Sequence, residues 1–273
     1  MRNLLSAGFA RLWRSKLFWL SCAFVATTTV IAIWTRYNER VQWDYPSVID
    51  GAFMYYVVFI AILIPLVCGQ FIGVDYNDGT VRNKLICGHG RGAVYLSNLI
   101  LCSAASLIMC TAAIAPGLAL GLPLLGGFNM GWTRAILFFV GVYTLALAWA
   151  ALFTLFSMLV NRRIAAMLLA LAMLAAGAYL EGRLEAGPTI PGFTVIVNGE
   201  VEEAEEYPNP DYLPEGPVRD AFQFLSDLTP GGQTLQHIEQ RAKQPEKLMA
   251  YDAVLFVIAT GAGLLLFKHK NLK

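Results

Sequence analysis

Residues 52–73 read AFMYYVVFIAILIPLVCGQFIG, a run without a single aspartate, glutamate, lysine or arginine. An apolar run of this length is sufficient for an α-helix to cross the roughly 30 Å hydrocarbon core of a bilayer. Backbone N–H and C=O groups find no water in that core, so a helix, which pairs them internally, is the expected form. The stretch therefore predicts a membrane-spanning helix.

Similar runs recur on both sides of this stretch. Of the 273 residues, 57% are hydrophobic and only 14% are charged, whereas soluble domains average about 25% charged residues. The runs predict an all-α polytopic membrane protein with six transmembrane helices, at about 17–35, 52–73, 94–119, 135–160, 164–181 and 250–267. Asn161, Arg162 and Arg163 would form a tight hairpin after the fourth span, and Pro65 and Pro116 would kink the second and third.

The N-terminal segment MRNLLSAGFARLWRSK (1–16) has an amphipathic pattern. Leu5, Phe9, Leu12 and Trp13 fall on one helical face, and arginines fall on another. We expect an interfacial helix that lies along the membrane surface. The alternative is the basic region of a signal peptide, which the long following apolar run and the lack of a clear cleavage site disfavour.

Lysine and arginine are distributed asymmetrically between the loops. They gather at the N-terminus, after the second span, in the hairpin after the fourth span and at the C-terminus, whereas the loops on the other side are mixed in charge. Cytoplasmic loops carry an excess of basic residues. Both termini and the loop after the second span are therefore expected to be cytoplasmic.

A hydrophilic, mainly acidic segment precedes the last span and is expected outside. Asn198-Gly199 between valine- and isoleucine-rich flanks predicts a hairpin, and residues 217–228 and 231–244 have the patterns of two short amphipathic helices. A small α+β extracellular insert is expected, with a loosely ordered acidic loop as the alternative. The expected parts are 1–181 with the interfacial helix and transmembrane helices 1–5, 182–249 as an extracellular acidic domain, and 250–273 with transmembrane helix 6 and a cytoplasmic tail.

The insert contains an expected extracellular acidic patch. Its residues are Glu200, Glu202, Glu203, Glu205 and Glu206. Negative charge of this density attracts cationic ligands, so the insert could recognise a cationic peptide or gate an exit. A lid that keeps the outer mouth closed is an equally good interpretation.

The spans lack the residue patterns of catalysis and ion coupling. They contain no H-E-x-x-H motif, no paired aspartates and no serine–histidine dyad, and Asp252 is expected at the outer end of the last span. Intramembrane catalysis and secondary transport are disfavoured, since the latter normally needs an ionisable residue within the membrane. No catalytic or metal-binding residue is predicted, and the five cysteines predict buried thiols rather than disulfides.

The phosphate-binding motif of ATPases is also missing from the sequence. The glycine-rich residues 88–92 lack a lysine at the required spacing and predict a flexible break before the third span. LTPGGQ (228–233) echoes the LSGGQ signature of ABC ATPases, but its proline replaces the serine. A turn with Thr229 as N-cap and Pro230 at the first helical position is the better interpretation.

The loop after the second span contains DYNDGTVRNKL (75–85). Asp78 or Thr80 could cap a short helix that begins near Val81, after a tight turn at Gly79. Val81 and Leu85 would share an apolar face. A solvated loop whose basic side chains contact anionic lipid headgroups is the alternative, although such a loop has no need for the acidic and glycine positions, whereas a docking element for another protein does.

Residues 73–91, GVDYNDGTVRNKLICGHGR, followed by VYLSNLI, resemble the first cytoplasmic loop of type-2 ABC exporter permeases. That loop has roughly the pattern E-[YF]-x-x-G-T-[IVL]-R-N-[KR], then a serine- and glycine-rich turn with an arginine. Asp75 stands where glutamate is usual. The acidic segment 209–233 is similar to that of bacterial permeases grouped with bacteriocin and lantibiotic self-protection exporters. The matching residues are Tyr76, Gly79, Thr80, Arg82, Asn83, Lys84 and Arg91.

The resemblance implies a coupling helix that docks on a separate cytoplasmic ABC ATPase. Tyr76, Val81 and Leu85 would be its apolar anchors, and charged neighbours would supply ionic complementarity. The residues implied to serve this contact are Asp75, Tyr76, Asp78, Gly79, Thr80, Val81, Arg82, Asn83, Lys84, Leu85 and Arg91.

The family also implies the partners. Two copies of the ATPase would hold ATP and Mg²⁺, this chain would hold no cofactor, and a second permease, identical or related, would complete the pathway. Membrane lipid is expected as a contact and nucleic acid is not. The implied function is export of an amphipathic or peptide-like substrate across a bacterial cell membrane. The alternative is a non-transporting sensor that detects a cationic peptide with its acidic extracellular domain.

Overall fold

The computed structural model describes residues 1–273 except 44–48, 161–162, 191–193, 198–199, 204–205, 243 and 271–273. Its helices are α1 (Arg2–Trp13), α2 (Lys16–Trp43), α3 (Ile49–Phe53), α4 (Tyr56–Asn77), α5 (Thr80–Ile86), α6 (Arg91–Leu125), α7 (Trp132–Val160), α8 (Arg163–Glu185), α9 (Pro217–Leu228), α10 (Pro230–Ile238) and α11 (Pro245–His269). The short strands are β1 (Thr189–Ile190), β2 (Thr194–Val197), β3 (Glu200–Glu203) and β4 (Tyr207–Pro208).

Among the described residues, six helices are long and apolar enough to cross a membrane, namely α2, α4, α6, α7, α8 and α11. The expectation of a mainly helical, multi-pass membrane protein is thereby confirmed. Most of these helices extend beyond the predicted spans, because backbone hydrogen bonding continues through polar residues at the ends of the apolar runs. The start of the second span differs from the prediction: α4 begins at Tyr56 instead of residue 52, because α3 ends at Phe53 and a turn follows it. Pro65 and Pro116 lie inside α4 and α6, which continue past them. Residues 161 and 162 of the expected hairpin lie outside the described part of the chain.

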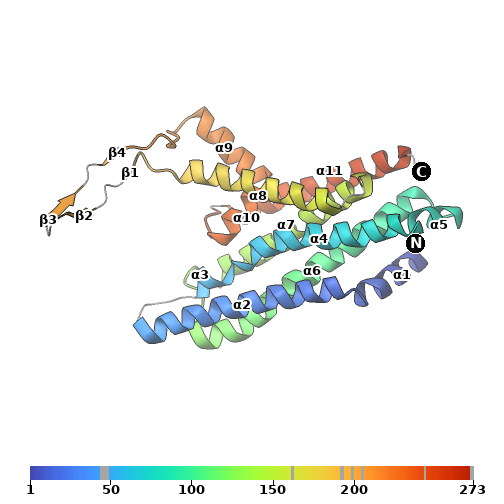
Figure 1. The fold of residues 1–273 in the computed structure, drawn as a ribbon, viewed down its shortest axis with the longest axis horizontal. Coiled ribbons are helices and arrows are strands. Elements are labelled where there is room, and N and C mark those ends of the chain that lie inside the picture. Colours follow the sequence, from blue (N-terminus) through green and yellow to red (C-terminus); the bar gives the residue numbers. More distant parts are fainter. Residues whose placement is uncertain are drawn as a thin grey trace.

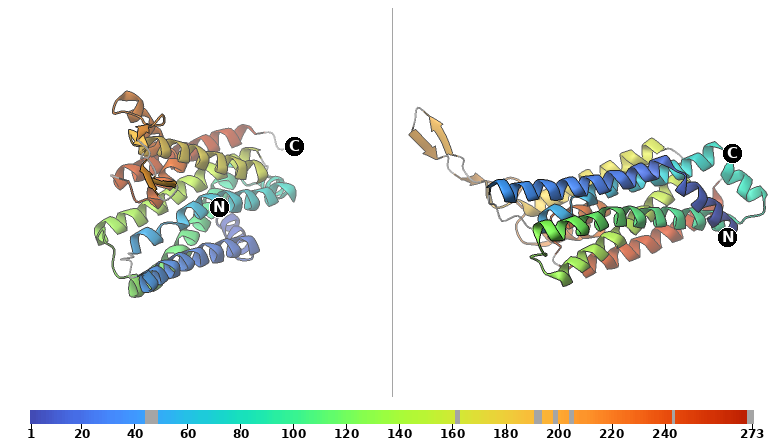
Figure 2. Two further views of the ribbon diagram at one scale, coloured as in Figure 1. Left: turned by 60° about the vertical axis from the view of Figure 1, so that its left-hand side comes forward. Right: turned by 90° about the horizontal axis from the view of Figure 1, so that it is seen from below.

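The long helices pack side by side, and the bundle has two different ends. Both termini and α5 lie at one end, and the paired strands extend from the other (Figures 1 and 2). The two ends are called here the terminal end and the strand end. The stretch 75–85 is therefore at the same end of the bundle as residue 1 and the C-terminal end of α11.

The centre of the bundle is formed by α4 and α7, whose apolar windows are the most buried. α2 packs along α6, and α11 packs along α7. Outward faces of the peripheral helices α8 and α11 remain apolar and exposed, as at Leu168 and Val257. Exposed apolar surface of this extent suits contact with lipid or with another membrane subunit.

The segment between α8 and α11 differs from the compact outer insert expected from the sequence. β2 pairs with β3 so that Val197 lies opposite Glu200, which matches the predicted hairpin, although Asn198 and Gly199 themselves lie outside the described residues. α9 forms at the predicted position. α10 is shorter than predicted and packs against α8, α4 and α7, so this helix belongs to the bundle rather than to a separate cap.

Two glycines allow α10 to enter the bundle. A Cβ atom on Gly231 of α10 would overlap the carbonyl group of Met173 in α8, and a Cβ atom on Gly177 of α8 would overlap the backbone of Gly231. Small residues permit this close approach of helix backbones within membranes. Thr229 precedes α10 as predicted, with Pro230 at the start of the helix, but its side chain makes no capping hydrogen bond.

Candidate functional site

The candidate site is built around α5, which glycines delimit at both ends. Gly79 (φ +66°) occupies the N-cap position, and Gly88 (φ +85°) follows the C-cap residue. Both adopt left-handed backbone conformations that favour glycine. The N–H of His89 donates to the carbonyl oxygen of Lys84 at 3.2 Å, and that of Gly88 donates to Leu85 at 3.0 Å. This is the Schellman pattern of a helix end, so the glycine-rich residues form a defined stop.

The predicted side-chain caps of α5 are wrong. Neither Asp78 nor Thr80 makes a side-chain hydrogen bond to the first turn, since the positive φ of Gly79 turns the chain instead. Asp78 is exposed and Thr80 is half-buried. The helix itself begins one residue before the predicted start at Val81.

Asp75 joins three elements at the terminal end. Its carboxylate is fully buried at the end of α4 and accepts hydrogen bonds from Arg11 of α1 and from Lys84 of α5. The Lys84 Nζ lies 2.8 Å from Asp75 Oδ2, and the second Arg11 nitrogen lies 3.1 Å from the same oxygen. The guanidinium of Arg11 also stands over the Phe71 ring, 4.0 Å from its centroid. α1, α4 and α5 are therefore held together by one ion-pair cluster.

This cluster changes the roles predicted for several residues. Asp75 and Lys84 were expected to face a partner, yet they bind each other within this chain. Val81, expected as an outward anchor, is 2% exposed and packs into the bundle core. The Tyr76 hydroxyl donates to the Met158 carbonyl oxygen at 2.7 Å. Lys84 and Val81 therefore fix α5 to the bundle, and Tyr76 fixes the end of α4 to α7.

The face of α5 that remains open is mixed in character. Arg82 and Asn83 are exposed as predicted, and Leu85 is half-buried. Ile86 is 76% exposed, and Cys87 directly after it is exposed as well. The sequence pattern did not single out Ile86, because Val81 and Leu85 already accounted for the expected apolar face. An exposed isoleucine beside an arginine and an asparagine is a surface suited to protein contact.

A second set of contacts fastens the end of α11 beside α5. Arg91, at the start of α6, donates to the carbonyl oxygens of Phe267 and Lys268 at 3.2 Å each, and also to that of Lys270. Lys270 in turn donates to the Met158 carbonyl oxygen at 2.7 Å. Burial lowers the pKa of the Lys270 ammonium. Arg91 was expected to contact a partner, whereas here it satisfies the terminal carbonyls of α11.

The expected acidic patch is at the strand end, far from α5. Glu200, Glu202 and Glu203 are residues of β3, and Glu206 is exposed. Glu205 lies outside the described residues. The patch and α5 occupy opposite ends of the bundle (Figure 1), so they cannot form a single site.

No family model and no curated protein matches this chain. The resemblance of residues 73–91 therefore rests on the sequence motif itself, and the function it implies is a proposal. Within the described part of the chain, no three histidine, cysteine, aspartate or glutamate side chains are grouped to hold a metal ion.

Two polar residues, Asp252 and His237, are buried inside the bundle. Asp252, expected at the outer end of the last span, lies seven residues after Pro245, the first residue of α11. It is 1% exposed and accepts a hydrogen bond of 2.8 Å from Thr144 of α7. The burial of this carboxylate against α7 was not predicted. His237 of α10 is fully buried near Gly141 of α7. Sequence reasoning did not single out His237, because its burial depends on the packing of α10 against other helices.

His237 should make the stability of the protein depend on pH. Burial lowers its pKa to about 4, against about 6.5 in an unfolded chain. The unfolded state therefore binds the proton first, and stability falls as the pH drops through this window, by about 2 kcal/mol between pH 6.5 and pH 4.5. As the pH is lowered, the thermal unfolding midpoint in detergent should fall more steeply for the wild type than for His237→Gln. His269→Gln, at an exposed position, is the control, and parallel curves for all three would contradict the prediction.

Proposed function

We propose that this chain is the permease subunit of an ATP-driven exporter, energised by a separate ABC ATPase that docks on α5. The observation that carries the proposal is that one short helix has an exposed face and is also held to the bundle by an ion-pair cluster. Arg82, Asn83 and Ile86 face outward, while Asp75 ties the same helix to α1 and α4. The motif resemblance of residues 73–91 supports the same assignment.

The ion-pair cluster gives α5 the mechanical property that coupling requires. A displacement of α5 by a partner acts on Lys84, and through Asp75 on the end of α4. α4 is a central helix that contacts α7 and α8. A partner that favours one position of α5 would thereby favour one arrangement of the spans. Energy coupling requires such a shift in the equilibrium between arrangements.

The partners follow from the same reasoning. ATP and Mg²⁺ would be bound by two copies of the ATPase, because this sequence lacks a phosphate-binding motif. A second permease, identical or related, would pack on exposed apolar surface. The asymmetry of lysine and arginine supports a cytoplasmic terminal end, with α1 at the membrane interface and the strand end outside a bacterial cell. An amphipathic or peptide-like substrate suits the largely apolar spans.

Substitution of the open face should detach the ATPase. Arg82→Glu combined with Ile86→Glu is expected to lower the amount of ATPase that co-purifies with this chain at least about tenfold, since it reverses a charge and removes an apolar contact. Both side chains are exposed, so the unfolding midpoint should not change. The measurement is quantitative mass spectrometry of a Walker-motif protein retained by the tagged chain in detergent. Lys84 is left intact because it pairs with Asp75.

A charge-matched control is available at the same end of the bundle. Arg14, just after α1, is exposed, and Arg14→Glu should retain the ATPase. Equal retention by the double variant and the wild type would contradict docking on α5. The sensor alternative predicts peptide binding without a fall in cell-associated peptide, whereas export predicts a fall that disappears when the ATPase carries a Walker mutation.

A further inference from the structure

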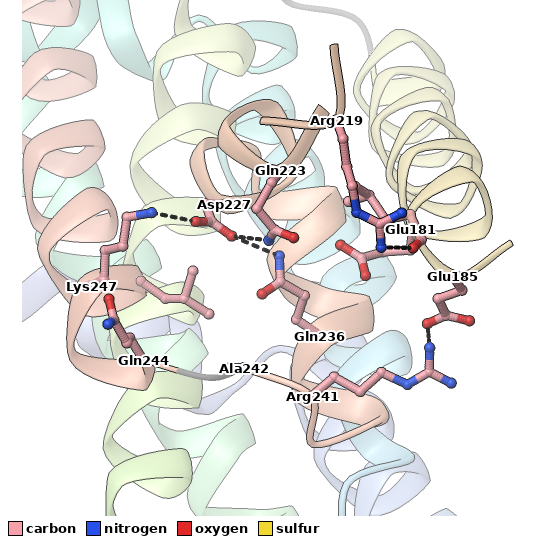
Figure 3. Close-up of a pocket in the computed structure, with 12 residues that line it drawn as sticks. Glu181, Glu185, Arg219, Gln223, Asp227, Gln236, Arg241, Ala242, Gln244 and Lys247 are labelled. Carbon is pink, nitrogen blue, oxygen red and sulfur yellow. Dashed lines mark hydrogen bonds and ion pairs between the residues drawn. The ribbon is translucent and has the colours of Figure 1, made fainter. Parts of the chain in front are cut away.

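A polar cavity of about 530 Å³ lies at the strand end of the bundle, between the end of α8, the helices α9 and α10, and the start of α11. Figure 3 shows acidic, basic and amide side chains directed toward it from all four helices. The volume is in the range typical of small-molecule sites. The cavity is separate from α5 and its ion-pair cluster.

The cations around the cavity already have partners. Lys247 binds Asp227 at 2.8 Å, and Arg241 pairs with Glu185 and with Glu239. Arg219 donates to the carbonyl oxygens of Leu213 and Leu184, at 2.7 and 2.6 Å. Each positive charge in the lining is thus already ion-paired with, or hydrogen-bonded to, another group of the protein.

Glu181 differs from the other acids of the cavity. It is 7% exposed, and it accepts a hydrogen bond from the Ser226 hydroxyl, which is itself bound by Gln236 at 2.9 Å. Among the described residues, no lysine, arginine or histidine nitrogen forms an ion pair with its carboxylate. A buried carboxylate without a countercharge is costly, and this one lines a cavity.

We propose that this cavity binds the ammonium group of an organic cation, with Glu181 as its countercharge. The remaining lining suits an organic molecule rather than a bare metal ion. Gln223 and Gln244 offer amide groups for hydrogen bonding, and Leu184 and Leu248 offer apolar contact. The site stands on its own geometry and does not depend on the function proposed for α5.

The probe for this site is n-butylammonium, with uncharged n-butanol of matched shape as the comparison. Binding is measured by calorimetry on the full chain in dodecyl maltoside. The wild type should bind the ammonium at least tenfold more tightly than the alcohol, and Glu181→Gln should lose at least tenfold in affinity for the ammonium. Glu215→Gln, at an exposed position outside the cavity, should bind as the wild type does. Equal affinity of the wild type and Glu181→Gln would overturn the proposal.

Two further arms complete the test. Added phosphatidylethanolamine should weaken n-butylammonium binding if the natural ligand is a lipid headgroup, and should leave it unchanged if the ligand is a free amine. Should Glu181→Gln fail to fold, the wild type still decides the question. Dicyclohexylcarbodiimide should then modify Glu181 several-fold more slowly with n-butylammonium present, as seen by peptide mass spectrometry. No protection would overturn the proposal.

Discussion

Replacing Gly231 with alanine should unfold or severely destabilise the protein. The added methyl group would overlap the carbonyl group of Met173, and a helix backbone has no rotamer by which to avoid the clash. Over-packing costs about 1–3 kcal/mol where side chains can adjust, and we expect the upper end of this range or more. In a thermal unfolding experiment in detergent, the midpoint should fall by roughly 10 °C.

The matched control for Gly231→Ala lies on the helix that α10 contacts. Gly182 of α8 has no atom within 4 Å of an added Cβ, so Gly182→Ala should be neutral or slightly stabilising, since alanine favours helix by about 1 kcal/mol over glycine. Gly177→Ala should lower the unfolding midpoint as Gly231→Ala does, because its added methyl group would overlap the backbone of Gly231. A Gly231→Ala protein that melts with the wild type would show that α10 does not pack on α8.

Loss of the Asp75 carboxylate should destabilise the terminal end and disconnect α5 from the spans. Asp75→Asn leaves Arg11 and Lys84 without their countercharge. Breaking a buried ion pair costs about 3–5 kcal/mol, and we expect about 3 kcal/mol because both cations keep partial access to solvent. With the ATPase bound, ATP turnover should continue while substrate export falls at least about tenfold.

A double variant separates this effect from general damage to the fold. Lys84→Met in the Asp75→Asn background removes one ammonium group that has lost its countercharge, and should recover part of the lost stability. Export should stay low, because the connection between α5 and α4 is still missing. The readouts are the unfolding midpoint and the ratio of substrate exported to ATP hydrolysed. An unchanged ratio in Asp75→Asn would refute the coupling role.

Apolar run length was sufficient to predict the spanning helices, because a membrane imposes a minimum length that few other structures need. α5 was also predictable, since glycines bracket a short amphipathic pattern. The ion-pair partners of its charged residues could not be predicted from the sequence. Arg11 and Asp75 are distant in sequence, and no local pattern indicates that two oppositely charged residues from different helices will meet in a buried pair.

The insertion of α10 was beyond local sequence reasoning for a related reason. Its glutamines and His237 are typical of a helix in water, and only the adjacent glycines hint at close packing. Burial of those polar side chains depends on contacts with α8, α4 and α7, which the linear sequence does not reveal. The cavity beside Glu181 likewise exists only once α9 and α10 have folded back onto the ends of α8 and α11.

The placement of the cysteines has a practical consequence. Cys87 is exposed directly after α5, whereas Cys22, Cys68, Cys102 and Cys110 are buried. Thiol reagents react with accessible thiolates, so a maleimide dye should attach to the unmodified protein at one position. The natural chain thus carries its own attachment point for a fluorophore, and a change in emission would report, in real time, when another molecule arrives at or leaves this end of the bundle.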